Sequence, residues 1–386
     1  PGGLAWTTHP DDDELDPTLY SGAAGNALTL LEAAQDIDDE RYADLARDAI
    51  GPLVAAVETT EHASLYFGRT GIAVALHALG HHLGQPAATA AAARALDLVE
   101  AGFDGERWNV QFELMGGNAG IALGALAAGR PELALLALSP YLRTIEPTAG
   151  GVQWEVRQET PARFHHISHG TLGIAHALAR VGAATGRDDM VELALLGAAD
   201  VVSRNEAGPD DFLVPHSDPQ HRPELIERYS YGWCHGPAGD AQAFRLLASV
   251  TGDAAWDTLG DRCWHTVTQS GLPARLRPGF WDNSGRCCGT AGVLALATDR
   301  YAERRSDLGF ARVLVDDLAE RATVDEHGAR WSNVEHRVTP SELPPRAGWA
   351  MGNAGIVREL LRLQRVLSGG RADDTVPWPD HPSVRR

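Results

Sequence analysis

Three of the four cysteines lie in two short stretches with matching surroundings. Cys234 lies in Gly-Trp-Cys-His-Gly at 232–236, and Cys287 and Cys288 lie in Arg-Cys-Cys-Gly at 286–289. Both stretches run into a Gly-x-x-Gly pattern, and thiols at matched positions of a repeated scaffold can converge in the folded chain. Because converging thiolates in a reduced protein most often hold zinc, the sequence predicts a sulfur-ligated zinc site.

A zinc ion with three sulfur ligands would have a predictable chemistry. Its fourth tetrahedral position stays open, which distinguishes catalytic zinc sites from structural ones. Three anionic sulfurs make the metal a weak Lewis acid toward carbonyls, yet it can keep a substrate thiol as a reactive thiolate near neutral pH. We therefore expect thiol addition or alkylation rather than hydrolysis. Cys263 lies within a helical pattern at 261–268 and is expected to be structural.

Histidines are concentrated before the fourth glycine pattern, in Phe-His-His-Ile-Ser-His-Gly at 164–170. His169 directly precedes the glycine, so it could act as a general acid or base; helix capping or a loop role is the alternative. Glu113, four residues before the third pattern, could orient this histidine or be a solvated or capping residue. The other candidates are His165, His166, His235 and His336. In contrast, His77 and His176 are expected to pack within helices.

Gly-x-x-Gly recurs seven times, at Gly22–Gly25, Gly68–Gly71, Gly117–Gly120, Gly170–Gly173, Gly236–Gly239, Gly289–Gly292 and Gly352–Gly355. An alanine-rich aliphatic run usually follows the second glycine, with the apolar spacing of a helix. A second, more amphipathic helical pattern lies between these runs, for example at 41–58, 87–101, 190–205, 254–270 and 310–323. The sequence therefore predicts repeated helix pairs and an all-α fold, with short strand-like pieces near 212–215.

These helix pairs could close into a ring or stack as an open solenoid. In a ring lined by the first helix of each pair, all the helix N-termini would point to one face, and the residues before the glycines would surround a central opening. An open solenoid would not bring the fifth and sixth helix-pair repeats together with the third and fourth repeats. Glycine at a helix start lets backbones approach closely, and we expect it to leave N–H groups exposed at the positive end of the helix dipole.

Composition limits the classes of function. The chain has 386 residues and a net charge of −19, which would repel a nucleic-acid backbone. The acidity is partly local, at 11–14 and 36–40, and fits a solvated surface or recruitment of a basic peptide. No apolar run reaches the roughly 18–20 residues that span a membrane, and we find no secretion signal. Because four cysteines in this length do not make a disulfide framework, we expect a cytoplasmic location.

The glycine patterns and thiol stretches together resemble the lanthionine synthetase C-like family, the cyclases of lanthipeptide biosynthesis and their relatives. The resemblance covers nearly the whole chain and is most specific at Trp-Cys-His-Gly-Pro-Ala-Gly (233–239) and Cys-Cys-Gly-Thr-Ala-Gly (287–292). It implies an (α/α)7 toroid, a double ring of seven inner and seven outer helices. We accordingly expect three parts: an N-terminal arm at 1–20, a cyclase domain at 21–370 and a C-terminal tail at 371–386.

The resemblance also implies roles for individual residues. The family's zinc ligands are a cysteine in the first stretch and a Cys-His pair in the second. Cys234 and Cys287 match two of these ligands, and Cys288 stands where many members have histidine, a variant found in part of the family. His169 matches the catalytic histidine, and Glu113 falls where cyclases often have an aspartate that partners it. We expect the substrate to be contacted by His166, His235 and Trp233, with plain packing as the alternative for Trp233.

The implied reaction is an intramolecular Michael-type addition. A cysteine thiol of a dehydrated precursor peptide attacks dehydroalanine or dehydrobutyrine and closes a thioether ring. Zinc would activate the thiol, while His169, oriented by Glu113, would protonate the enolate carbon or deprotonate the incoming thiol. Because the sequence contains no kinase-like glycine loop, dehydration would need a separate dehydratase or a kinase/lyase enzyme or domain.

Three alternatives stay open on sequence alone. A related enzyme would add glutathione or another thiol to dehydroamino acids and would share the zinc site. A non-catalytic helical-repeat binding protein would need thiols that are structural and metal-free. A helical-toroid glycosidase or terpene cyclase would need paired carboxylates or Asp-rich motifs on inner helices, whereas the Asp-rich run at 11–13 lies in the N-terminal arm.

Overall fold

The computed structural model describes residues 3–8, 12–37, 39–274, 283–304, 308–332, 344–372, 376, 378 and 379. It divides into two compact units. The first unit comprises Pro1–His62, Tyr66–Leu98 and Leu272–Trp378, and the second comprises Ala63–Leu65, Val99–Gly271 and Pro379–Arg386. His336, a candidate from the sequence, lies outside the described residues. Every helix in the described ranges is too short or too polar to cross a lipid bilayer.

A helix begins directly after the first glycine of each Gly-x-x-Gly pattern, as predicted. These glycine-led helices are α1 (Ala23–Asp36), α4 (Arg69–His82), α6 (Asn118–Ala127), α8 (Thr171–Thr185), α10 (Pro237–Thr251), α12 (Thr290–Arg304) and α14 (Asn353–Leu367). Most of these helices are buried on nearly all sides; in α8, burial is continuous from Thr171 to Ala179. Helix α14 differs, because Gln364 and Leu367 near its end are exposed. A helix without a solvent-facing stripe belongs to the interior, so the glycine-led helices other than α14 are the inner members of their pairs.

The second helices of the pairs are amphipathic. In α9 (Asp188–Ser203) the buried residues recur at three- and four-residue spacing between Met190 and Val201. The others are α2 (Glu40–Asp48), α3 (Ile50–Thr59), α5 (Pro86–Ala101), α7 (Pro131–Leu138), α11 (Ala254–Gln269) and α13 (Leu308–Arg321), with a 3-10 turn, η1 (Ser139–Leu142), after α7. The prediction of a single helix at 41–58 is wrong, because two helices, α2 and α3, occupy this stretch. Pro52 lacks the N–H that would bond the Asp48 carbonyl, which instead accepts from the Leu4 amide at 3.0 Å.

Three short antiparallel pairs supplement the helices in the described ranges. They are β1 (Glu146–Pro147) with β2 (Val152–Gln153), β3 (Arg163–Phe164) with β4 (Ser217–Asp218), and β5 (Thr323–Asp325) with β6 (Gly328–Arg330). The strand-like piece expected near 212–215 is not a strand; the pairing begins two residues later, where Ser217 lies opposite Phe164. This pairing fixes the segment that leads into the histidine-rich fourth turn.

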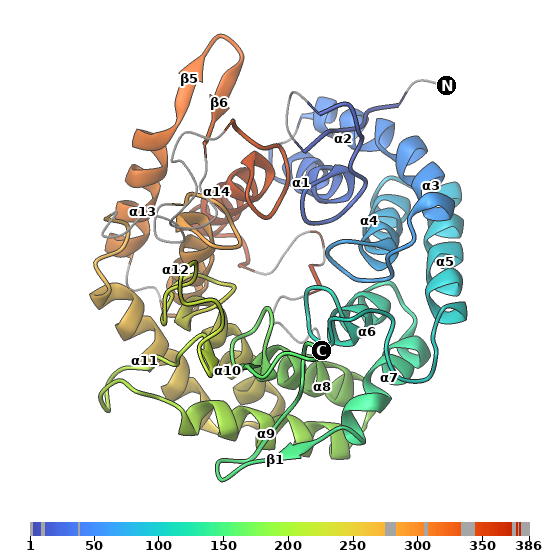
Figure 1. The fold of residues 1–386 in the computed structure, drawn as a ribbon. Helices are drawn as coiled ribbons and strands as arrows, with labels where there is room; N and C mark the ends of the chain where they lie inside the picture. Colours follow the sequence, from blue (N-terminus) through green and yellow to red (C-terminus); the bar gives the residue numbers. More distant parts are fainter. Residues whose placement is uncertain are drawn as a thin grey trace. The chain divides into compact units, whose positions relative to one another are not determined.

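The glycine-led helices pack against one another within each unit. In the first unit, α12 contacts α14, α14 contacts α1, and α1 contacts α4. Helix α14 therefore lies beside α1, the first helix of the chain (Figure 1). Contact between the first and last repeats is the opposite of an open solenoid, in which each repeat touches only its neighbours in sequence. In the second unit, α8 contacts both α6 and α10.

Backbone hydrogen bonds join the turns that precede these helices at equivalent positions. In the second unit, the Met115 amide donates to the Ser168 carbonyl, and the Ser168 amide donates to the Cys234 carbonyl, each at 3.3 Å. All three residues lie two positions before the first glycine of their turn. The same position gives three bonds in the first unit: Cys287 to Ala350 (2.8 Å), Ala350 to Tyr20 (2.9 Å) and Tyr20 to Tyr66 (2.9 Å). We call these bonds the turn ladder.

The second glycine of the pattern is required by the close approach of neighbouring turns. A Cβ atom on Gly173 would lie 1.9 Å from the Ile167 carbonyl oxygen and 3.3 Å from Cβ of Leu114 in the preceding turn. A Cβ atom on Gly239 would similarly lie 1.9 Å from the Trp233 carbonyl oxygen and 2.7 Å from Cγ2 of Ile167. Any side chain at these positions would force the turns of the ladder apart.

The N–H groups at the starts of α1 and α12 are not exposed, contrary to the expectation from the sequence. The first helical amide bonds a carbonyl of its own loop, as Ala23 does to Asp16 at 2.7 Å and Thr290 does to Asn283 at 3.0 Å. The next amide in α12, from Ala291, bonds a loop carbonyl in the same way at 3.2 Å. These helix starts are satisfied by the turn itself, so they do not offer their dipole end to an anion.

We expect Gly173→Ala to lower the free energy of unfolding by at least about 1–3 kcal/mol, the usual cost of overpacking a core. The matched control is Gly260→Ala in α11, where the nearest atom to a new Cβ is 3.8 Å away. That substitution should raise the free energy of unfolding by up to about 1 kcal/mol, because alanine is the better helix former. Urea unfolding measures both; equal effects would contradict the close approach described above.

Candidate active site

The turn ladder presents the candidate residues from equivalent places in different turns. Cys234 and Cys287 are both ladder residues, two positions before the first glycine. His169 and Cys288 lie one position later, directly before the glycine of their turns. Because the ladder consists of main-chain bonds, it fixes these positions whichever side chains they carry.

Cys287 and Cys288 form a buried pair in the first unit. They are 3% and 8% exposed, and their sulfur atoms lie within 4.8 Å of each other. Two sulfurs that bind one tetrahedral zinc ion through bonds of about 2.3 Å each also lie within this limit. Sulfur is also the ligand type that soft or borderline metals such as zinc prefer. The pair therefore fits a thiolate-held metal ion.

Cys234 is the corresponding buried thiol of the second unit, 2% exposed. Its carbonyl accepts two hydrogen bonds from Ser168, one from Oγ at 2.7 Å and one from the backbone amide at 3.3 Å. Ser168 directly precedes His169, so the fourth and fifth turns are tied together where each presents its candidate side chain. Ser168 could not be predicted from the sequence, because one serine within a histidine-rich stretch carries no pattern of its own.

His169 lies beside Glu113, which is one of the arrangements that the sequence left open for the glutamate. Glu113 Oε2 is 3.4 Å from His169 Nδ1, within ion-pair range if the imidazole is protonated. The glutamate side chain is fully buried, so it is not a solvated residue, whereas that of the histidine is 19% exposed. The carboxylate also accepts the Met115 amide at 2.5 Å and the Gly116 amide at 3.0 Å. These bonds hold the carboxylate in place, while the histidine retains access to solvent.

Two further imidazoles adjoin His169. The ring of His235 stacks on that of His169, with centroids 5.2 Å apart, and lies 4.0 Å from the ring of His216. Burial lowers the pKa of both His216 and His235 well below the usual range, with neighbouring imidazoles adding to the effect. Both rings are therefore neutral at neutral pH. His216 belongs to no glycine turn, so the repeat pattern could not have identified it.

The remaining histidines of the fourth turn are held by burial. His166 Nδ1 lies 2.8 Å from Asp240 Oδ2, and both side chains are fully buried. Burial raises the pKa of the Asp240 carboxyl, an effect that His166 opposes. Burial also lowers the pKa of His165 to about 3, so this imidazole is neutral. Asp240 lies in the first turn of α10 and was not among the candidates from the sequence.

Trp233 and Cys263 are interior residues of the second unit. The indole of Trp233 is fully buried, and its N–H donates to the Gln242 side chain at 2.8 Å. Cys263 is fully buried in α11, and this burial raises the pKa of its thiol well above the usual value. A thiol that resists ionisation is a poor metal ligand, which fits the structural role expected for Cys263.

Comparison with known proteins gives one family match. Residues 13–212 and 220–315 match the family described as "Lanthionine synthetase C-like protein". No curated protein matches the chain.

Several solved structures are similar to this chain. Nisin cyclase has a TM-score of 0.66 and 16% identity, with 91% of this chain and 89% of that chain covered. A variant of the alpha-1,6-mannanase of Salegentibacter sp. HEL1_6 has a TM-score of 0.53 and 11% identity, covering 81% and 99%. The unsaturated glucuronyl hydrolase of Bacillus sp. GL1 has a TM-score of 0.52 and 15% identity, covering 82% and 88%. At such identities the likeness shows the fold alone, and the first match confirms the predicted all-α toroid class.

We expect His165 to make the protein less stable as the pH falls. Its pKa is about 3 in the fold and 6.5 in a model peptide, so between these values the unfolded chain binds one more proton than the native protein. This residue should therefore lower the free energy of unfolding by about 1.4 kcal/mol per pH unit below about pH 6. His165→Asn should remove that part of the slope in urea unfolding between pH 7 and pH 5. An unchanged slope would mean that the native imidazole is already protonated.

Proposed function

Because the chain belongs to the lanthionine synthetase C-like family, we propose that it is a zinc-dependent lanthipeptide cyclase. It would add cysteine thiols of a dehydrated precursor peptide to dehydroalanine or dehydrobutyrine and form thioether rings. The observation that carries the proposal lies within the second unit. There, Ser168 donates two hydrogen bonds to the carbonyl of Cys234, so the turn of the proposed acid–base residue His169 is joined to the turn of a candidate thiolate.

The zinc ligands would be Cys234, Cys287 and Cys288. All three thiols are buried before the same glycine pattern, and two of them lie within bridging distance in the first unit. Zinc bound there would lower the pKa of a substrate thiol and so supply the nucleophile. With Cys288 in place of the histidine found in many relatives, the ligand set would be all sulfur, which favours thiol activation over carbonyl polarisation.

His169 would move the proton in this reaction. When the substrate thiolate forms its S–C bond at the β carbon, the alkene π electrons pass to the α carbon, which then takes up a proton. Nδ1 of His169 faces Glu113, so the other ring nitrogen would exchange the proton with substrate. The buried Glu113 would stabilise the imidazolium, and its two backbone hydrogen bonds keep it directed at the ring.

The other predicted site residues would shape the pocket. His235, stacked on His169, would form its wall as a neutral ring. Complete burial beside Asp240 supports a role for His166 in holding the turn rather than the direct substrate contact expected from the sequence. The buried indole of Trp233 and its bond to Gln242 support the packing role.

Two other functions would use the same scaffold. A related enzyme would add glutathione or another external thiol to dehydroamino acids, whereas a binding protein would carry no metal. We favour internal cyclisation because the matching family is described as lanthionine synthetase C-like, whereas the shared fold does not separate the three functions. The dehydrated substrate would come from a separate dehydratase or from a kinase/lyase enzyme or domain, and a reducing cytoplasm would keep the thiols available.

We expect the purified protein to hold one zinc ion per chain. Cys234→Ala and Cys287→Ala should each lower the zinc content sharply, because each removes one of three sulfur ligands. Cys263→Ala is the matched control, since it removes a buried cysteine of α11 and should leave the zinc content unchanged. Elemental analysis after dialysis measures all four proteins. Zinc-free wild-type protein, prepared without chelators and supplied with the metal, would leave only the binding-protein alternative.

We expect the protein to protect precursor thiols from alkylation without adding mass. After incubation with a dehydrated precursor peptide, thiol alkylation and mass spectrometry should show fewer free cysteines and no mass gain. His169→Asn should lower the rate by about 10²–10⁴-fold, the usual contribution of general acid–base catalysis. His265→Asn, on the exposed side of α11, should keep the wild-type rate.

The same assay separates the alternatives. A gain of one glutathione mass per dehydroamino acid, in the presence of glutathione, would favour external thiol addition. Thiols alkylated as fast with the protein as without it would contradict the cyclase proposal.

A further inference from the structure

The sixth turn differs from the other six turns in the residue at one equivalent position. Three positions before the first glycine, the others carry a buried apolar residue: Leu19, Leu65, Leu114, Ile167, Trp233 and Trp349. The sixth turn carries Arg286 at this position, directly before Cys287, and this arginine is only 4% exposed. Burying a guanidinium is costly unless it is paired and hydrogen-bonded, so the substitution requires a compensating group.

The compensating group is Glu359 on α14. Arg286 Nε donates to Glu359 Oε1 at 2.7 Å, and the two side chains are 5% and 1% exposed. Glu359 is also an exception within the repeat. Seven positions after the first glycine, the other glycine-led helices carry no acid: Thr29, Ala75, Gly124, Ala177, Ala243 and Leu296. The two departures from the repeat therefore meet in one hydrogen bond.

Helix α14 is shaped to let the arginine reach this carboxylate. Gly355 lies one helical turn before Glu359, and a Cβ atom on it would lie 2.8 Å from Cβ of Arg286. The arginine stem thus starts against a glycine, and its guanidinium carbon lies 5.5 Å from the ring centre of Trp349. The Cys287 amide donates to the carbonyl of Ala350, which follows Trp349 in the turn before α14. The main chain of Cys287 and the side chain of Arg286 therefore both attach the sixth turn to the start of α14.

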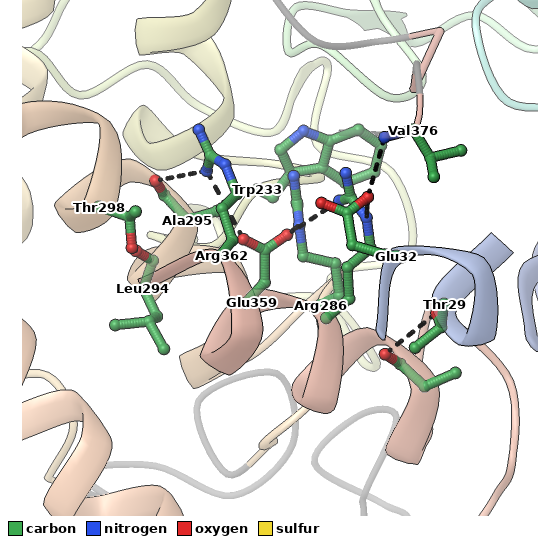
Figure 2. Close-up of polar contacts among 12 residues, drawn as sticks. Thr29, Glu32, Trp233, Arg286, Leu294, Ala295, Thr298, Glu359, Arg362 and Val376 are labelled. Carbon is green, nitrogen blue, oxygen red and sulfur yellow. Dashed lines mark hydrogen bonds and ion pairs between the residues drawn. The ribbon is translucent and has the colours of Figure 1, made fainter. Parts of the chain in front are cut away.

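Other charged groups fix Glu359 in turn (Figure 2). Its carboxylate lies 3.6 Å from Arg362 Nη1. It also lies 3.3 Å from Arg358 Nη1. Arg362 also pairs with Asp299 and donates to the Ala295 carbonyl at 3.3 Å, both on α12. Helix α12 begins just after Cys287 and Cys288. Glu359, which holds Arg286, is therefore also connected to the helix that follows the two thiols.

We propose that Glu359 is a positioning residue for the Cys287–Cys288 pair and acts through Arg286. A charge-assisted hydrogen bond fixes both the direction and the reach of the arginine, whose main chain continues directly into Cys287. An apolar residue, as in the other turns, would fill the space without fixing an orientation. The inference rests on the proposed zinc role of the thiols. Partners that orient metal ligands in this way commonly change metal affinity by about 10–100-fold.

The test compares Glu359→Gln with Asp36→Asn. Asp36 belongs to the same unit, is 11% exposed and pairs with Arg365 at 2.7 Å rather than with Arg286. Zinc affinity is measured by competition with a chromogenic chelator, and the thiolate-to-cobalt absorption band is recorded after cobalt substitution. Glu359→Gln should weaken zinc binding about 10–100-fold and shift the band, whereas Asp36→Asn should retain both. Wild-type affinity in Glu359→Gln, or equal loss in both variants, would overturn the proposal.

Arg286 variants test the route of the effect. If Glu359 acts through Arg286, the double variant Arg286→Gln/Glu359→Gln should lose no more zinc affinity than Arg286→Gln alone. Arg286→Lys keeps the charge but loses the planar guanidinium, so it should also weaken zinc binding. Wild-type zinc affinity in this variant would assign the effect to charge alone and overturn the positioning role.

Measurements of folding and of zinc binding by the wild-type protein distinguish a failure of this inference from a failure of the proposed function. Circular dichroism shows whether each variant is folded. Failure of the folded wild-type protein to bind zinc would contradict the proposed function. Equal zinc binding by the wild-type protein and Glu359→Gln would contradict only this inference.

Discussion

The turn ladder is the constraint on which the rest of the structure depends. Residues two positions before each glycine pattern bond one another through backbone N–H and C=O groups, so the turns stand in register within each unit. The close approach needs glycine three residues into the pattern, where a Cβ atom would strike a carbonyl oxygen of its own turn. Because the bonds are independent of the side chains, the same ladder position carries Tyr20 and Ala350 in some turns and the thiols of Cys234 and Cys287 in others.

This regularity explains why so much was predictable from sequence. The seven glycine patterns located every glycine-led helix at its first residue, because glycine is needed there for close packing. The same spacing predicted His169 as a candidate but left a solvated or capping role open for Glu113; the two residues lie in adjacent turns of the second unit. A feature that recurs in register can be read from one chain, since each copy supports the interpretation of the others.

The parts that sequence did not predict are those that break the repeat. Asp240 and His216 take positions beside the fourth and fifth turns through burial and strand pairing, neither of which leaves a periodic signal. The break between α2 and α3 follows from one proline within an otherwise helical pattern. Arg286 and Glu359 are 73 residues apart, and only the packing of α14 shows that each compensates for the other.

The contact between α14 and α1 has a consequence for synthesis on the ribosome. The Cys287 amide needs the carbonyl of Ala350, and the Ala350 amide needs that of Tyr20. A nascent chain that has just exposed both thiols of the sixth turn still lacks the acceptor that seats them. The first helix must likewise wait for the last before its own turn is complete. Completion of the sixth turn is thereby coupled to emergence of the seventh repeat.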